Sequence, residues 1–284
     1  MGARTRTIRA VIAPLLVVLV PWGMGVGPTG ASGQEASRRF SARSATPSDL
    51  PRPIDDLTIR PTVMVRKGTA RGSGTIIGST KGRSLILTAA HVIDGPGELQ
   101  IELHRYNLGI EGRKLGGNWP KVVPARAVAA DPEADVAVLL VEGLAKLPYV
   151  ASIDTGIDRP PTEGAAVVSV GIDHASDLNS WESRVRGTAW LSRTAASPEG
   201  DGPDPGPRGK GGTPRLFLIT EHPPIKGRSG GGLFSSEGKL LGLCVGRIEI
   251  KQAGGEEAAI GLFASGPSIL KVLEQLETDD SAPK

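Results

Sequence analysis

The sequence predicts an all-β protein built from many short antiparallel strands. Glycine and proline are abundant, with 39 and 23 residues among 284, and these two residue types are the least favourable in helices. Short segments rich in Val, Ile, Leu and Thr recur between turn residues, which is typical of strands. No long amphipathic helix separates them, so parallel crossover connections are not expected. A hydrophobic content of 39% and a net charge of +3 exclude a disordered chain.

The strand-like segments fall into two sets of six, which predicts two small barrels or sandwiches. The first set comprises 57–65, 72–78, 84–88, 99–104, 122–130 and 135–141. The second set comprises 164–171, 183–192, 215–220, 231–236, 239–246 and 258–264. The connection between the sets lies at 146–163, so we expect an N-terminal unit at 57–150 and a C-terminal unit at 151–265.

The N-terminal end has the pattern of a targeting signal. Arginines, an apolar run and the small residues Ala31-Ser32-Gly33 follow one another, which predicts a cleaved signal peptide at 1–33. We therefore expect a secreted or periplasmic protein, which no longer contacts a membrane once the signal is cleaved. Retention of the segment as a membrane tether is the alternative. The polar, proline-containing residues 34–56 are interpreted as a linker.

Two further segments stand apart from the strands. The Gly/Pro-rich residues 196–212 predict a long exposed loop within the C-terminal unit. Apolar residues recur at helical spacing between Pro267 and Leu276. We therefore expect a short C-terminal helix and tail at 266–284.

Cysteine and charge patterns exclude several classes of function. The single cysteine, Cys244, cannot form an intrachain disulfide or a cysteine-based zinc cage. Its position within an apolar strand indicates a buried, inert thiol. Lysine and arginine are scattered without interleaved aromatics, which argues against a nucleic-acid partner. No His-Glu-x-x-His motif or acidic cluster indicates a metal site, and no cofactor is expected.

Three short motifs carry candidate catalytic residues. LILTAAHVID presents His91 after a strand, DPEADVAVL places Asp135 at the start of an apolar strand, and GRSGG holds Ser229 between glycines. Each motif alone is an ordinary turn or strand end, but the three together favour nucleophilic catalysis. A serine hydroxyl needs an adjacent base, histidine titrates near neutral pH, and a carboxylate fixes the histidine tautomer.

The glycines around Ser229 fit the same chemistry. Acyl transfer develops a negatively charged oxygen that backbone N–H groups must meet, and the amides of Gly227 and Ser229 are the candidates. His222 is a rival base, but it lies in the turn-like EHPP segment, where an exposed or pocket-lining position is expected. The G-x-S-x-G elbow of α/β-hydrolases requires a histidine after the serine, and this sequence has none there.

The sequence resembles trypsin-like (chymotrypsin-fold) serine proteases, above all their bacterial Deg/HtrA-type branch. GSGTIIG with LILTAAHV resembles the Gly-Ser-Gly strand and catalytic-histidine turn of that branch, and PIKGRSGGGLFSSEGKLLGL resembles its nucleophile loop. DPEADVAVL resembles its aspartate strand, in which the second aspartate, Asp135 rather than Asp131, is catalytic. The resemblance covers about residues 60–265. It implies two six-stranded antiparallel β-barrels and a serine endopeptidase that cleaves polypeptides through an acyl-enzyme.

Departures from the family pattern bear on regulation. Arg228 stands where the digestive branch carries an aspartate that pairs with a newly cut N-terminus, so that activation mechanism is not expected. Gly232 replaces the usual proline. Only a short segment follows residue 265, so the PDZ domains of the Deg/HtrA branch, and its trimer, are not carried over. The sequence leaves the oligomeric state open.

The resemblance also locates a substrate pocket, just before the nucleophile and on a following strand. The residues concerned are Pro223, Pro224, Ile225, Leu243, Cys244 and Val245. None of them is acidic, so we expect cleavage after small or aliphatic residues rather than after Lys or Arg. The alternative function is a latent enzyme or a non-catalytic peptide-binding module on the same fold.

Overall fold

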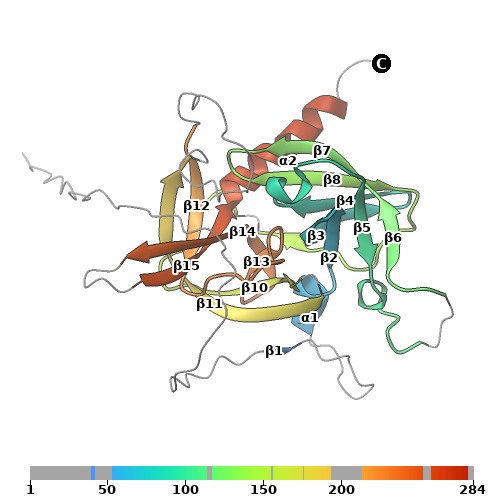
Figure 1. Ribbon diagram of the computed structural model, residues 1–284, viewed down its shortest axis with the longest axis horizontal. Helices are drawn as coiled ribbons and strands as arrows, with labels where there is room; N and C mark the ends of the chain where they lie inside the picture. The colour runs from blue at the N-terminus through green and yellow to red at the C-terminus, as the bar shows by residue number, and fades with distance from the viewer. Residues whose placement is uncertain are drawn as a thin grey trace, which may run out of the picture.

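The computed structural model describes residues 40–41, 53–113, 117–154, 156–174, 176–192, 213–251 and 257–280. The predicted signal peptide, most of the predicted linker and the Gly/Pro-rich loop lie outside the described residues. Two sheets make up most of the described chain and lie side by side in Figure 1. Within these ranges, none of the helices combines the length and the apolar character that crossing a membrane requires.

The N-terminal sheet is a curled sheet with the strand order β6-β5-β2-β3-β4-β8-β7. Its strands are β2 (Thr62–Lys67), β3 (Ala70–Thr80), β4 (Arg83–Thr88), β5 (Leu99–Leu103), β6 (Lys121–Pro124), β7 (Arg126–Asp131) and β8 (Val136–Glu142). Only Ala125 separates the two edge strands, β6 and β7, in the chain. The segment expected as one strand at 122–130 therefore bends at Ala125 and serves both edges of the sheet.

The C-terminal sheet closes into a ring of six strands. These are β10 (Ala166–Asp173), β11 (Asp177–Leu191), β12 (Arg215–Thr220), β13 (Gly232–Ser235), β14 (Lys239–Lys251) and β15 (Glu257–Ser265). The ring follows the order β11-β10-β13-β14-β15-β12, and β12 pairs back onto β11. Two short strands, β1 (Phe40–Ser41) and β9 (Ser152–Ile153), join β11 and β14 from outside. The predicted double β-barrel of the chymotrypsin type is confirmed.

The start of the N-terminal unit differs from the expectation. The strand expected from residue 57 begins only at Thr62, because Pro53–Thr58 form a short helix, α1. Proline is favoured in the first turn of a helix, and the acidic side chains of Asp55 and Asp56 complement its positive end.

The predicted C-terminal helix is present as α2 (Gly266–Asp280). It begins in the second barrel and packs against β7 and β8 of the first (Figure 1). Its residues Ile269 and Val272 are completely buried. This packing explains the apolar run Val136–Val141 of β8, because that part of the strand is buried on both faces, one facing the barrel core and the other α2.

Candidate active site

A short turn at the end of β4 presents His91 to solvent. The turn is a 3-10 helix, η1 (Ala90–Ile93), and Ala90 and Val92 on either side of the histidine are buried. These two anchors fix the backbone while the His91 side chain remains 38% exposed. A histidine that is both fixed and accessible is suited to proton transfer.

Asp135 holds both the ring and the backbone of His91. Its Oδ2 lies 2.5 Å from His91 Nδ1, and its Oδ1 accepts a 2.8 Å hydrogen bond from the His91 N–H. Asp135 adopts a φ of +57°, a left-handed conformation that aspartate tolerates better than most residues. Its side chain is only 8% exposed. The carboxylate thus orients the imidazole and leaves Nε2 as the nitrogen available for proton exchange.

Asp131, the first aspartate of the same motif, has a different role. Its Oδ1 accepts hydrogen bonds from the N–H groups of Glu133 and Ala134, which shapes the turn leading into β8. Its Oδ2 accepts a 2.8 Å hydrogen bond from Arg215 Nε and lies 3.7 Å from Lys271 Nζ. Asp131 therefore links the first barrel to β12 and α2, and the structure brings Asp135, not Asp131, to His91.

Ser229 lies on a tight turn that only glycines allow. Gly227 and Gly230 have φ angles of +96° and +85°, in the left-handed region that favours glycine. A Cβ on Gly230 would lie 2.1 Å from the carbonyl oxygen of Ser73. The Ser229 hydroxyl donates a 3.3 Å hydrogen bond to the Val245 carbonyl. Among the described residues it makes no hydrogen bond to His91.

The histidine turn and the nucleophile turn converge on Gly72. A Cβ at this glycine would lie 2.6 Å from the Val92 side chain and 2.9 Å from the Ser229 carbonyl oxygen. The Ser73 N–H donates a 2.7 Å hydrogen bond to the same carbonyl. The segment that follows His91 and the segment that holds Ser229 therefore both pack against the same residue of β3.

Two amides of the nucleophile turn are left without acceptors. In the described part of the chain, the N–H groups of Gly227 and Ser229 donate to no protein oxygen. Other amides of the turn are used, since Arg228 donates to the Ile225 carbonyl and Gly230 to the Cys244 carbonyl. The two remaining donors are those expected to meet an oxyanion.

The six predicted pocket residues occupy different environments. Pro224, Leu243 and Cys244 are buried, Pro223 and Val245 are half-buried, and Ile225 is exposed. Leu243 and Cys244 belong to two separate apolar clusters, as expected for successive residues on opposite faces of a strand. Burial raises the pKa of the Cys244 thiol to about 12. The assignment of these six residues to a substrate pocket stays a prediction.

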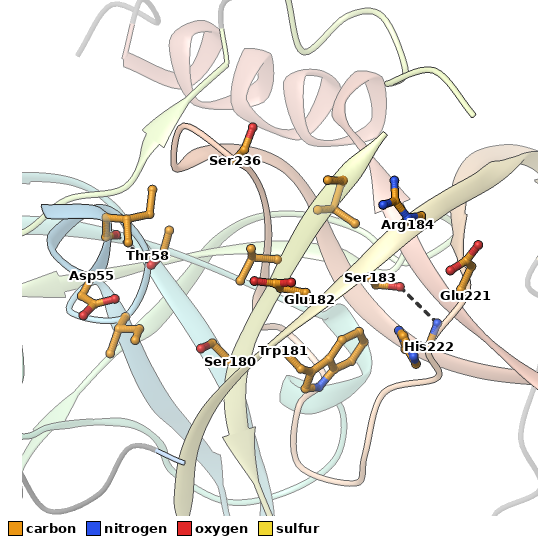
Figure 2. A pocket seen from close by; sticks show the side chains of 15 residues that line it. Asp55, Thr58, Ser180, Trp181, Glu182, Ser183, Arg184, Glu221, His222 and Ser236 are labelled. Atoms are coloured by element: carbon orange, nitrogen blue, oxygen red, sulfur yellow. Dashed lines mark hydrogen bonds between the residues drawn. The ribbon is translucent and has the colours of Figure 1, made fainter. Parts of the chain in front are cut away.

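A cavity of about 500 Å³ lies between α1 and the strands β10 and β11 (Figure 2). Trp181 and His222 line it, with their rings in edge-to-face contact at 6.0 Å. None of the three candidate catalytic residues lines this cavity. Across the described ranges, no three His, Cys, Asp or Glu side chains gather into a metal-binding group.

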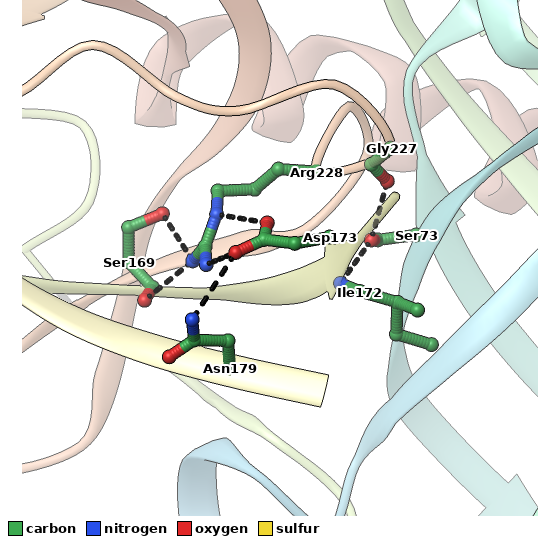
Figure 3. A network of polar contacts seen from close by, with 7 residues as sticks. All are labelled: Ser73, Ser169, Ile172, Asp173, Asn179, Gly227 and Arg228. Atoms are coloured by element: carbon green, nitrogen blue, oxygen red, sulfur yellow. Dashed lines mark hydrogen bonds and ion pairs between the residues drawn. The ribbon is translucent and has the colours of Figure 1, made fainter. Parts of the chain in front are cut away.

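Sequence reasoning did not single out Ser73, Ser169 or Asp173, which contact the nucleophile turn (Figure 3). Ser73 donates from its hydroxyl to the Gly227 carbonyl, while Ser169 and Asp173 accept from Arg228. One signal was available in the sequence. An arginine set among glycines and apolar strands requires a carboxylate partner when it is buried, and Asp173 ends an apolar strand.

Comparisons with known proteins found a matching family, a related sequence and related folds. A family model described as trypsin-like peptidase domain matches residues 72–243. The chain is 25% identical over 266 residues to the periplasmic pH-dependent serine endoprotease DegQ of Escherichia coli (strain K12), a match that covers 93% of this chain and 47% of that protein. The chain thus spans about half the length of the curated relative it matches.

Solved structures of the protease Rv3671c from M. tuberculosis H37Rv share the fold. The active form matches with a TM-score of 0.57 and 20% identity, covering 92% of this chain and 96% of that chain. An inactive serine-to-alanine mutant matches with a TM-score of 0.56 and 22% identity, covering 84% and 96%. At these identities the likeness concerns the fold alone.

Proposed function

We propose, since this chain belongs to the family of trypsin-like peptidases, that it is a serine endopeptidase whose catalytic residues are His91, Asp135 and Ser229. Family membership makes it a serine peptidase that acts on polypeptides. The observation that carries the residue assignment is the pairing of His91 Nδ1 with Asp135 Oδ2 beside the turn that holds Ser229.

The reaction proceeds through an acyl-enzyme. Ser229 Oγ attacks the carbonyl carbon of the peptide bond while His91 Nε2 takes the hydroxyl proton. The imidazolium then gives this proton to the amine nitrogen, the C–N bond breaks, and the acyl group remains on Ser229 as an ester. Water repeats the attack with the same base, which releases a carboxylic acid and restores the serine. Asp135 stabilises the imidazolium in both steps.

The two unused amides of the turn support a role in this reaction. The N–H groups of Gly227 and Ser229 lie within three residues on one tight turn, and neither has an acceptor in the described residues. Donors that are already oriented stabilise the negative oxygen of the tetrahedral intermediate more than they stabilise the substrate carbonyl. Their joint use lowers the barrier to acylation.

The strand after the nucleophile supports an extended substrate. Strand β13 pairs with β14 only as far as Leu243, whereas β15 pairs with β14 from Gly242 to Lys251. Among the described residues, no strand pairs with the other edge of β14 at Val245 and Gly246, and we infer that an added peptide strand is held there by main-chain hydrogen bonds. The apolar residues near the turn favour cleavage after small or aliphatic residues. Dominant cleavage of a peptide panel after Lys or Arg would contradict this preference.

Export is part of the proposal. The basic and apolar pattern of residues 1–33 is typical of a signal peptide, and the relative DegQ is described as periplasmic. N-terminal sequencing of the exported protein is expected to begin at Gln34. A sequence that still contains the apolar run would instead support a membrane-tethered protease.

One observation favours the alternative of a latent enzyme. The Ser229 hydroxyl donates to the Val245 carbonyl instead of to His91, so its proton is not yet directed at the base. A rotation of the serine side chain is needed before attack. If substrate binding causes this rotation, the protein is an active protease. If nothing does, it is a latent enzyme or a peptide-binding module.

Hydrolysis of an unfolded protein substrate tests the proposal. We expect the purified protein to cleave it, and Ser229→Ala to abolish cleavage. Ser236→Ala is the matched control, because Ser236 is an exposed serine seven residues further along the chain. Cleavage that survives in Ser229→Ala, or none in the unaltered protein, would overturn the assignment.

A further inference from the structure

Arg228, the residue directly before Ser229, has the largest fully buried side chain in the described part of the chain. Its exposure is 0%. A guanidinium is costly to remove from water unless its charge and its N–H groups find partners. The partners of Arg228 therefore show what the residue does in the turn.

Arg228 is held by one β-hairpin of the second barrel. Nε and Nη2 donate to the two carboxylate oxygens of Asp173 at 2.9 and 2.7 Å, and Nη1 donates to the Ser169 carbonyl at 2.9 Å (Figure 3). The guanidinium also lies over the Trp181 ring, 4.9 Å from its centre. Asn179 donates a further hydrogen bond to Asp173. The three partners of Arg228, and Asn179 behind Asp173, all come from β10 and β11.

The same hairpin orients a peptide group that carries a candidate oxyanion donor. The His174 N–H, next to Asp173, donates a 2.7 Å hydrogen bond to the Lys226 carbonyl. Because a peptide group is planar, fixing this carbonyl also fixes the N–H of Gly227. The Arg228 carbonyl accepts a 2.8 Å hydrogen bond from the Gly231 N–H. This carbonyl shares a planar peptide group with the N–H of Ser229, so that N–H is fixed as well.

The first barrel holds the turn from its other side. The Ser73 hydroxyl donates to the Gly227 carbonyl at 2.9 Å and accepts from the Ile172 N–H at 2.8 Å (Figure 3). Between these two supports, the side chain of Arg228 is the link that docks the turn onto the hairpin. Gly171 leaves space for it, since a Cβ there would lie 2.7 Å from Arg228 Cγ.

We propose that Arg228 is a positioning residue, and that its ion pair with Asp173 holds the nucleophile turn in the conformation in which the amides of Gly227 and Ser229 form the oxyanion hole. This inference rests on the proposed protease function. Replacing a buried ion pair by apolar side chains is often neutral or stabilising, so stability alone gives little reason for this pair. The two-pronged hydrogen bonding of arginine to a carboxylate adds geometric precision, which an oxyanion hole requires.

Three variants separate a positioning role from a structural one. Arg228→Gln and Asp173→Asn each remove one charge and leave the other buried, which lowers stability. The double variant Arg228→Gln/Asp173→Asn removes both charges and is expected to recover stability. A purely structural role predicts that activity recovers with it, whereas a positioning role predicts that it does not. Arg66→Gln is the control, because it breaks an arginine–carboxylate pair with Glu102 in the first barrel.

The readouts are the rate of fluorophosphonate labelling, the split of peptide hydrolysis into kcat and KM, and hydrogen exchange of residues 226–232. For the double variant we expect labelling and kcat to fall about 10²- to 10³-fold, the effect of losing an oxyanion donor. We also expect KM to be little changed and exchange in the turn to rise, while Arg66→Gln stays unchanged in these readouts. Arg228→Lys is expected to retain more activity than Arg228→Gln.

Wild-type rates and unchanged exchange in a folded double variant would overturn the inference. If the unaltered protein is not labelled at all, the proposed function fails. The exchange measurement still tests the pair in that case, because faster exchange confined to the turn supports positioning and unchanged exchange refutes it.

Discussion

Asp135 accepts hydrogen bonds from both the ring Nδ1 and the backbone N–H of His91, at 2.5 and 2.8 Å. One carboxylate therefore sets the position of the histidine and the direction of its ring. We predict that Asp135→Asn lowers kcat about 10⁴-fold, because the amide favours the wrong imidazole tautomer. Asp131→Asn is the control and is expected to keep near-normal kcat at moderate temperature. The reverse result in steady-state hydrolysis would show that the aspartates had been assigned wrongly.

Asp131→Asn is expected to lower stability instead. Burial alone raises the pKa of Asp131, but hydrogen bonds from Arg215 and the Ala134 amide, with the charges of Arg215 and Lys271, outweigh it and place the pKa below the ordinary 3.8. The folded state thus favours the ionised form, so this stabilisation is present above pH 3.8 and is lost as the pH falls below it. Urea unfolding is expected to show a loss of about 1–3 kcal/mol at pH 7. A difference that persists unchanged at pH 3 would contradict the account.

Gly230→Ala is expected to disable the nucleophile turn. Its φ of +85° strains any other residue, and a Cβ would lie 2.1 Å from the Ser73 carbonyl oxygen. A left-handed residue other than glycine lowers the folding stability by about 1–3 kcal/mol. Because the clash also forces the turn to move, we expect the rate of fluorophosphonate labelling of Ser229 to fall as well. Gly143→Ala is the matched control, since its φ of +79° is similar and no atom lies within 4 Å of its Cβ position. Equal activity of the two variants would refute the role given to the turn.

Cys244 is expected to be chemically silent in the folded protein. Burial raises the pKa of its thiol to about 12, from an ordinary value of 9.0. Iodoacetamide at pH 8 should therefore modify the protein in urea but not the folded protein. Above pH 9 the unfolded thiol ionises while the folded one does not, so the free energy of unfolding falls. Cys244→Ala should lack this part of the pH dependence, and alkylation of the native protein would refute the burial.

Local sequence patterns predicted the barrels and the histidine–aspartate pair. Short apolar segments between turn residues marked nearly all the strands, and Asp135 was separated from Asp131 by resemblance to a family motif. The helix at Pro53–Thr58 was missed, because the apolar residues that follow it read as the start of a strand. The predicted pocket and the roles of the oxyanion amides remain predictions.

Contacts between distant segments were beyond the reach of these patterns. Ser73 and Gly227 are 154 residues apart and meet only because the two barrels pack together. Arg228 and Asp173 are 55 residues apart and meet only once the hairpin has formed. The sequence showed that Arg228 does not suit activation by a new N-terminus, but not that a carboxylate inside the second barrel already pairs with it.

The most direct test of the central claim is to locate a fluorophosphonate adduct by mass spectrometry. We predict a single adduct on Ser229 in the unaltered protein, and none in His91→Ala, because the hydroxyl needs its base. An adduct on another serine, or no adduct with any fluorophosphonate, would contradict the assignment of Ser229 as an activated nucleophile.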